Sequence, residues 1–159
     1  MLNLIFAIKF VHVLAAAAMF GTWLGIAAFM ALAHRSGNTS VVALVANFAV
    51  SVEKIIMIAA IALQPISGQA LSSAIGLAPL EEFWLTTSLV LYAAVIVAWF
   101  AALRIEIRIR NLARQAALDG VKLPAEYRRL YRLYCRIAWP ALAVVVVMFL
   151  LMVWQPRAS

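Results

Sequence analysis

Long apolar blocks separated by short polar interruptions dominate the pattern of the 159-residue chain. A helix that crosses the hydrocarbon core of a bilayer needs about 20 predominantly apolar residues. The pattern therefore predicts an all-α integral membrane protein, a four-transmembrane-helix bundle in a single domain, residues 1–159. The expected spans are about 2–33, 54–74, 84–103 and 137–154. The first block has no basic segment ahead of it, so we expect it to be a retained span.

The second apolar block, residues 41–78, is too long for one span and contains Glu53 and Lys54. A charge at the centre of a bilayer costs at least about 2.5 kcal/mol on insertion scales. We therefore place Glu53 and Lys54 at the cytoplasmic interface, where they form structural ion pairs with the basic loop or mark the inner end of the second span. Residues 41–52 then form a separate interfacial helix. Pro65 and Gly68 predict a kink, and the carbonyl freed by the proline needs a donor from a neighbour or from water.

Residues 104–136 are predicted to form amphipathic cytoplasmic helices between the third and fourth spans. Residues 104–118 continue the third span, with Glu106 four residues before Arg110 as a supporting pair. The alternation over residues 104–110 also fits a strand, but an isolated strand would have unpaired edges. A turn around Gly120 precedes a second helix at 125–136.

The charge of this loop predicts how the chain is oriented. Residues 104–136 hold nine Lys or Arg residues against three acidic residues. Cytoplasmic loops carry such an excess, so the loop is expected inside the cell and both termini on the extracytoplasmic side. The exposed basic set could also bind anionic lipids, although topology alone explains it. Its members are Arg104, Arg108, Arg128, Arg129, Arg132 and Arg136.

Composition agrees with a membrane protein and excludes several classes of function. The chain is 67% hydrophobic with a formal net charge of +7, and its positive residues flank apolar spans, which argues against nucleic-acid binding. Cys135 is the only cysteine, so no intramolecular disulfide or thiolate metal site is available. No phosphate loop, nucleophile elbow or buried carboxylate pair is recognisable, so conventional hydrolase or kinase chemistry has no support.

His12 is the strongest candidate for chemistry because it lies well inside the first predicted span. An intramembrane histidine can ligate haem iron or copper, or relay a proton. The alternative is a neutral histidine bonded to another helix. Lys9, one turn away, could neutralise a haem propionate or extend to the headgroups. His34 is expected to be a solvated loop residue beside Arg35.

Three further residues could belong to a site around His12. Met19, nearly two turns from His12, could be a second haem ligand, although methionines in such bundles usually serve packing. Gln64 and Ser67, together with Gln69, place polar atoms in an apolar helix, where they could meet His12 or a ligand. Ordinary hydrogen bonds between helices are the alternative.

Several short motifs resemble the bacterial membrane family known as domain of unknown function 2269, which would place the chain in the bacterial inner membrane. They are Lys9-Phe10-Val11-His12, Phe20-Gly21, Gln64-Pro65-Ile66-Ser67-Gly68, Trp84-Leu85, Arg110-Asn111-Leu112-Ala113-Arg114 and Leu123-Pro124-Ala125-Glu126-Tyr127.

A more distant similarity links Lys9, His12 and the Pro65 helix to HemJ-type protoporphyrinogen oxidases and CopD-type copper proteins. HemJ-type proteins bind haem b, and their essential histidine corresponds to His12. Their histidine and lysine after the third-span tryptophan correspond to Thr86 and Ser88.

Three functions follow as expectations. The first is a haem b protein with a redox or tetrapyrrole-linked role, in which His12 ligates the iron; an enzyme of this kind would be a membrane oxidoreductase. The second is a small-molecule or copper transport protein, with His12 as the metal ligand. The third is an accessory or assembly subunit. A homodimer or a larger membrane complex is compatible with each.

Overall fold

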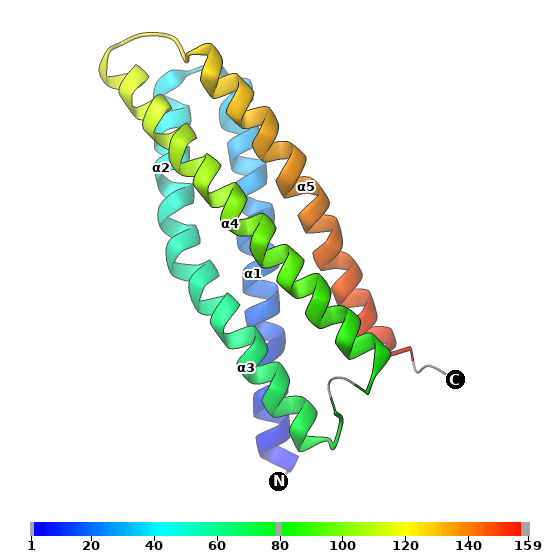
Figure 1. Cartoon of the computed structure of the whole chain (residues 1–159). Helices are drawn as coiled ribbons and strands as arrows, with labels where there is room; N and C mark the ends of the chain where they lie inside the picture. The colour runs from blue at the N-terminus through cyan, green and yellow to red at the C-terminus, as the bar shows by residue number, and fades with distance from the viewer. Residues whose placement is uncertain (1, 79–80, 157–159) are drawn as a thin grey trace.

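The computed structural model describes residues 2–78 and 81–156, and their regular structure is entirely helical. The elements are α1 (Leu2–Ser36), α2 (Thr39–Val52), the π-helical segment η1 (Glu53–Met57), α3 (Ile58–Ala74), α4 (Phe83–Leu118) and α5 (Ala125–Trp154) (Figure 1). Because α2, η1 and α3 follow one another without a break, the described chain forms four helical rods. The start of α1, the α3–α4 connection and the end of α5 lie at one end of the bundle.

Each of the four rods is long and apolar enough to cross a membrane. The rods cover Asn3–Ser36, Thr39–Ala74, Phe83–Leu118 and Ala125–Trp154. The prediction of an all-α protein with four helices of transmembrane length is therefore confirmed. At about 1.5 Å per residue, a rod of 36 residues is about 54 Å long, well beyond the roughly 30 Å of a hydrocarbon core.

The second rod divides close to the place that the sequence predicted. Residues 41–52 lie in α2, which continues directly into η1 and α3, and the interfacial position expected for them stays a prediction. The side chain of Asn38 caps α2 by accepting hydrogen bonds from the backbone N–H groups of Ser40 and Val41. Glu53 is fully buried whereas Lys54 is exposed, and Glu53 does not form the expected ion pair with the basic loop. Adjacent helical residues are about 100° apart and cannot face the same side.

Residues 119–124 connect α4 to α5, and residues 125–136 form the first part of α5. Residues 104–118 are a continuous extension of the third span in α4, as predicted. Glu106 is buried in this extension and does not pair with Arg110, whose guanidinium donates to the side-chain oxygen of Asn111. The buried positions of α4 explain this burial, because Glu106 shares their 3.5-residue spacing. These positions include Trp99, Ala102, Glu106, Ile109, Ala113 and Ala116.

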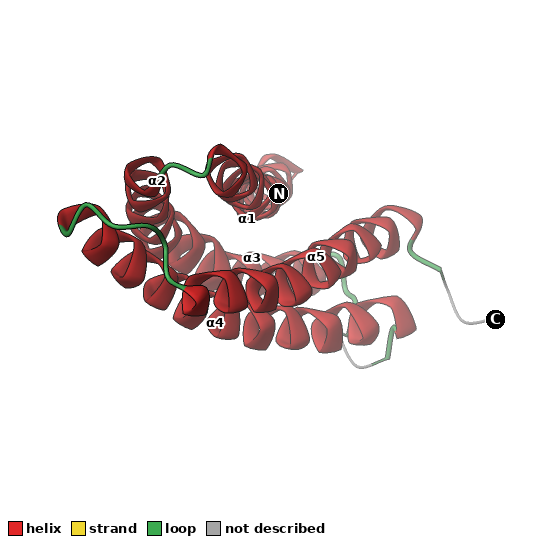
Figure 2. Ribbon diagram, turned by 90° about the horizontal axis from the view of Figure 1, so that it is seen from above, coloured by secondary structure: helices red, strands yellow, loops and turns green. Residues whose placement is uncertain are grey.

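Packing joins the rods in pairs. The most extensive contacts are between α4 and α5, α2 and α4, and α1 and α3. Viewed from above, α1 and α2 lie on one side of the molecule while α4 and α5 lie on the other (Figure 2). Alanines together with many larger side chains, including Trp23 and Trp99, fill the interior. Large apolar side chains such as Phe6, Phe48 and Val153 are exposed, as expected for a surface that meets lipid.

The proline of α3 has the partner that the sequence required. Pro65 lies inside α3 and has no N–H to donate to the carbonyl of Ile61, four residues earlier. The hydroxyl of Tyr92, on α4, donates to that Ile61 carbonyl with an O···O distance of 2.6 Å. This bond satisfies a carbonyl that would otherwise be unpaired in an apolar interior, and it ties α3 to α4.

We predict that Tyr92→Phe lowers the free energy of unfolding by about 1 kcal/mol, because the Ile61 carbonyl loses its donor. In a Pro65→Ala background the backbone N–H of residue 65 can supply that donor, so the same tyrosine substitution should cost clearly less. Unfolding of the four proteins in detergent, followed by circular dichroism, gives the coupling between the two sites. An equal cost of Tyr92→Phe in both backgrounds would contradict the interpretation.

Candidate functional site

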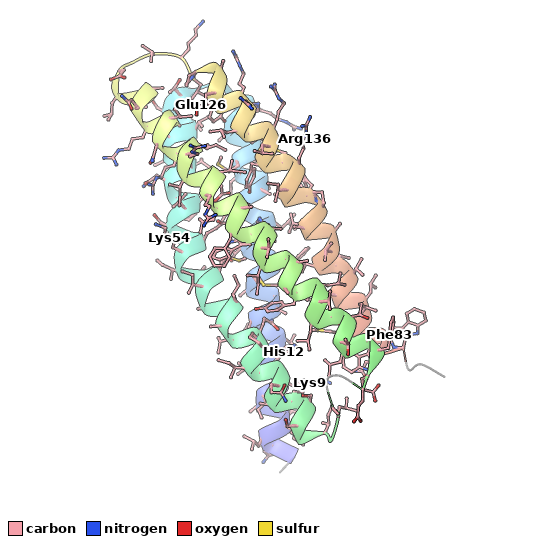
Figure 3. All side chains as sticks on the ribbon, viewed as in Figure 1. Lys9, His12, Lys54, Phe83, Glu126 and Arg136 are labelled. Carbon is pink, nitrogen blue, oxygen red and sulfur yellow. The ribbon has the colours of Figure 1, made fainter. Side chains whose placement is uncertain are left out.

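His12, on α1, is held by two polar residues of α3. Its ring Nδ1 lies 2.9 Å from the hydroxyl oxygen of Ser67, and the side-chain amide of Gln64 donates to the His12 backbone carbonyl over 3.0 Å. Ser67 and Gln64 are buried, and His12 is half-buried. Figure 3 places His12 and Lys9 in the part of the bundle nearer the chain's beginning. The expected meeting of Gln64 and Ser67 with His12 is thus observed, while Gln69 is exposed and bonds to Ser73 instead.

The bonds of Ser67 assign the hydrogen of the His12 ring. The Ser67 hydroxyl donates its single hydrogen to the backbone carbonyl of Leu63, over 2.5 Å. It must therefore accept a hydrogen from His12, so Nδ1 carries the N–H of the neutral imidazole. The lone pair then lies on Nε2, for which no hydrogen bond is found within the described part of the chain. A histidine oriented in this way presents Nε2 as a base or as a metal ligand.

Gly68 allows this close approach of α3 to the imidazole. A Cβ atom built at Gly68 would stand 3.3 Å from Cε1 of His12 and 3.7 Å from its Nδ1. The first distance is tighter than ordinary van der Waals contact, so a larger residue would push the ring away from Ser67. The Ser67-Gly68 pair of the sequence therefore both bonds to the histidine and makes room for it.

Lys9 and Met19 are placed differently with respect to His12. Lys9 lies one turn from His12 on α1 and its side chain is exposed. Met19 is 3% exposed and packs in the hydrophobic core. Of the five residues predicted for the site, His12, Gln64 and Ser67 are brought together by hydrogen bonds. The roles of Lys9 and Met19 as a charge partner and a ligand stay predictions.

His34, expected to be a solvated loop residue, packs between helices instead. It lies in the last turn of α1, where its Nδ1 is 3.1 Å from the hydroxyl of Tyr127. Its ring stacks on Tyr131, with 4.0 Å between centroids. The spacing of the tyrosines on α5 brings both rings to the end of α1, so His34 serves as an aromatic contact between α1 and α5.

A second polar group in the interior was not recognised in the sequence. Glu53 of η1 and Glu106 of α4 are 0% and 1% exposed, and their carboxyl groups interact directly. The indole of Trp99 faces Glu53, and the phenol of Tyr134 faces Glu106. The prediction that the chain holds no buried carboxylate pair is therefore wrong. The helical spacing of Glu53 with Ala46 and Ala49 could have revealed that Glu53 lies on the buried face.

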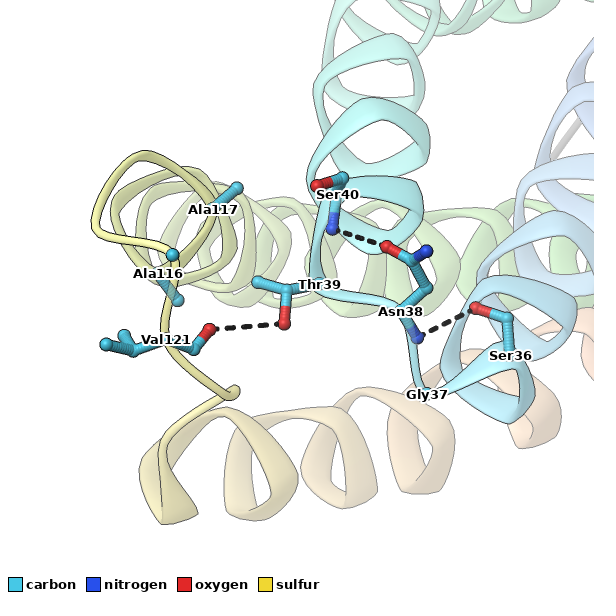
Figure 4. Close-up of a pocket in the computed structure, with 9 residues that line it drawn as sticks. Ser36, Gly37, Asn38, Thr39, Ser40, Ala116, Ala117 and Val121 are labelled. Atoms are coloured by element: carbon cyan, nitrogen blue, oxygen red, sulfur yellow. Dashed lines mark hydrogen bonds between the residues drawn. The ribbon is translucent and has the colours of Figure 1, made fainter.

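The end of the bundle far from His12 is basic and carries a hollow. All six arginines predicted for lipid contact are exposed. A hollow of about 370 Å³ lies between the start of α2 and the end of α4, where Thr39 donates to the backbone carbonyl of Val121 (Figure 4). No charged side chain lines this hollow. Within the described residues no three His, Cys, Asp or Glu side chains are grouped so as to hold a metal ion.

Four apolar rods with polar side chains gathered in their interior define a multi-pass integral membrane protein. The chain belongs to the family described as predicted integral membrane protein (DUF2269), which matches residues 6–156. The resemblance drawn from the short motifs is thus confirmed across nearly the whole sequence. No curated protein and no solved structure matches the chain.

We predict that His12 is neutral with its hydrogen on Nδ1, and that Ser67→Ala releases this preference so that an Nε2–H form appears. Nitrogen-15 NMR of histidine-labelled protein measures the two ring nitrogens, and the chain has only two histidines to assign. Ser72→Ala is the matched control, because Ser72 is also a buried serine of α3 but donates to the carbonyl of Gln69. An Nε2–H form in the unmodified protein would refute the assignment.

Proposed function

We propose that this protein binds haem b in the membrane and has a redox-linked role, in which Nε2 of His12 would hold the iron. The observation that carries the proposal is the orientation of the imidazole, whose Nδ1–H is bonded to Ser67 while Nε2 keeps its lone pair. Haem-ligating histidines need a neutral ring with one free nitrogen. The similarity of Lys9 and His12 to HemJ-type proteins supports the same ligand.

The other residues of the site would support the haem in distinct ways. Ser67 fixes the ring orientation of His12, and Gln64 anchors the backbone of α1 at the ligand. Lys9, exposed one turn away, would neutralise a propionate. Met19, nearly two turns further along α1, is the candidate for a second residue that would hold the iron. Bound haem would supply one-electron chemistry, while the protein sets its potential through these groups.

We expect the protein purified from cells supplied with haem to show a Soret band, and His12→Ala to lose it because the iron loses its ligand. Ser67→Ala should weaken haem binding about 10-fold to 100-fold, as is usual when the partner of a ligating histidine is removed. Absorption spectra and haem titrations measure both effects. His34→Ala is the matched control and should keep the band, since His34 belongs to the aromatic contact with α5.

The same experiment distinguishes haem from copper. A free Nε2 also suits copper, which makes a copper-handling or transport protein the second candidate. Elemental analysis that finds copper lost in His12→Ala, without any Soret band, would replace the haem proposal by this one. A colourless and metal-free protein would exclude both and leave the accessory-subunit interpretation.

We also propose that the arginine-rich end lies at the cytoplasmic surface and binds anionic lipid. The six arginines of this end are exposed, and no ion pair to an acidic side chain is found for them within the described residues. Positive residues at the inner face support an orientation with both termini outside the cytoplasm. Each basic residue near an anionic surface contributes about 1 kcal/mol.

We expect replacement of Arg128, Arg129 and Arg132 by glutamine to reduce the amount of phosphatidylglycerol that copurifies with the protein. The reason is that three exposed positive charges of α5 are lost while its buried residues are kept. Mass spectrometry of bound lipids measures the change, and Lys9→Gln serves as a control at the other end. Unchanged lipid content in the triple variant would contradict lipid binding by these arginines.

A further inference from the structure

The buried carboxyl pair is the least expected feature of the interior. Glu53 and Glu106 come from two different rods and are 0% and 1% exposed, and their carboxyl groups interact with each other. Within the described residues, none of the four carboxyl oxygens has a partner at hydrogen-bonding geometry. Unpaired carboxyl oxygens in an apolar interior are costly, so their presence needs an explanation beyond packing.

Unpartnered donors face the pair from neighbouring positions. The indole N–H of Trp99 is directed to Glu53 from α4, and the hydroxyl of Tyr134 is directed to Glu106 from α5. Both side chains are at least 98% buried, and neither polar atom has a hydrogen bond of its own in the described structure. The indole N–H of Trp23, on α1, is likewise buried and unpaired in the same core. The interior thus holds both acceptors and donors that are not saturated.

No positive charge neutralises the two carboxyl groups. The side chains that interact electrostatically with Glu53 are those of Glu106 and Trp99. Those that interact with Glu106 are Glu53 and Tyr134. Cys135 lies near Tyr134 and interacts with its phenol. Within the described residues no lysine or arginine takes part, and the nearest ones along the sequence, Lys54 and Arg104, are exposed. Two adjacent carboxyl groups without a counter-charge cannot both be ionised, so the pair has to hold at least one proton.

The backbone at Glu53 adds a second sign of function. The π-helical segment begins at Glu53, and its residues 54–56 are exposed while Glu53 and Met57 point inward. Short π-helical segments inside α-helices occur frequently at functional sites. An apolar residue would have filled this position at lower cost than a carboxylic acid without hydrogen bonds.

We propose that Glu53 and Glu106 form a buried proton-binding site between the helices, which takes up a proton from water and releases it again as the protein works. On uptake, one carboxylate oxygen forms an O–H bond with a proton given up by hydronium, and the second carboxyl shares that proton. Release reverses the step, and no oxidant or reductant is required. Tyr134 and Trp99 stabilise the charge that remains on the pair. The site does not depend on haem binding at His12.

Dicyclohexylcarbodiimide labelling of the full chain in phosphatidylcholine vesicles tests the proposal, because this apolar reagent modifies protonated carboxyl groups in membranes. Mass spectrometry should find the label on Glu53 or Glu106, and the label should decrease reversibly as the pH is raised, because the reagent needs a protonated carboxyl group. The exposed Glu126 is an internal control. No label at any pH, or a label that does not respond to pH, would overturn a site that exchanges protons.

Two matched variants, Glu53→Gln and Glu106→Gln, keep the shape of the side chains. Infrared titration of the carboxyl C=O band should show two coupled steps in the unmodified protein and one step in each variant. Two steps that persist in both variants would assign the protons to other groups and reject the proposal. Loss of the label on adding sodium at constant pH would identify a metal-cation site and would also reject it. If a variant does not fold, the pH dependence of labelling in the unmodified protein still tests whether the site exchanges protons.

Discussion

Water is absent from the core of a bilayer, and the rest of this structure depends on that constraint. Every polar group inside a rod has to find its partner in the protein. The carbonyl freed by Pro65 is satisfied by Tyr92, and the polar side chains of α3 bond to His12 of α1. These bonds join rods that lipid-facing apolar surfaces could not hold together, because lipid tails are as apolar as the side chains.

The same constraint gives meaning to the polar groups that remain unsatisfied. In a water-soluble protein a buried carboxyl group could gain an ordered water molecule from the surface, but here Glu53 and Glu106 are enclosed by the helices and are 0% and 1% exposed. Glu53 and Glu106 therefore have each other, Trp99 and Tyr134 as their described neighbours. His12 differs, because its Nδ1 is hydrogen-bonded to Ser67 whereas its Nε2 is left to bind a ligand or a proton.

The sequence predicted those features that follow from periodic apolar content. The four rods, the need of Pro65 for a partner and the meeting of His12 with Ser67 and Gln64 could all be inferred from spacing and hydrogen-bond chemistry. The prediction was wrong at Glu53, because the cost of a buried charge argues against an acid in the interior, and at Glu106, because its spacing to Arg110 indicates an exposed ion pair. That cost is avoided when a carboxyl group is protonated, so only the helical stripe to which each residue belongs could have shown its burial.

His34 shows a further limit of reading one segment at a time. Its neighbours Arg35 and Ser36 are exposed and predict a solvated loop, whereas its ring contacts come from Tyr127 and Tyr131, more than 90 residues later. Tertiary contacts of this kind leave no signal near the histidine itself. The helical spacing of Tyr127 and Tyr131 places them on a common face of α5, but it does not show what that face meets.

The π-helical segment lets the two halves of the second rod pack against different helices. By the 3.6-residue spacing, Val42 and Ala46 in α2 have the same helical phase as Gln64 and Ser67 in α3, so an uninterrupted α-helix would direct all four to one neighbour. A π turn takes in about one additional residue and changes the phase by about 100°. Accordingly α2 packs mainly on α4, whereas α3 packs mainly on α1. One rod can thus contribute Glu53 to a site shared with α4 and, further along, Ser67 to a site shared with α1.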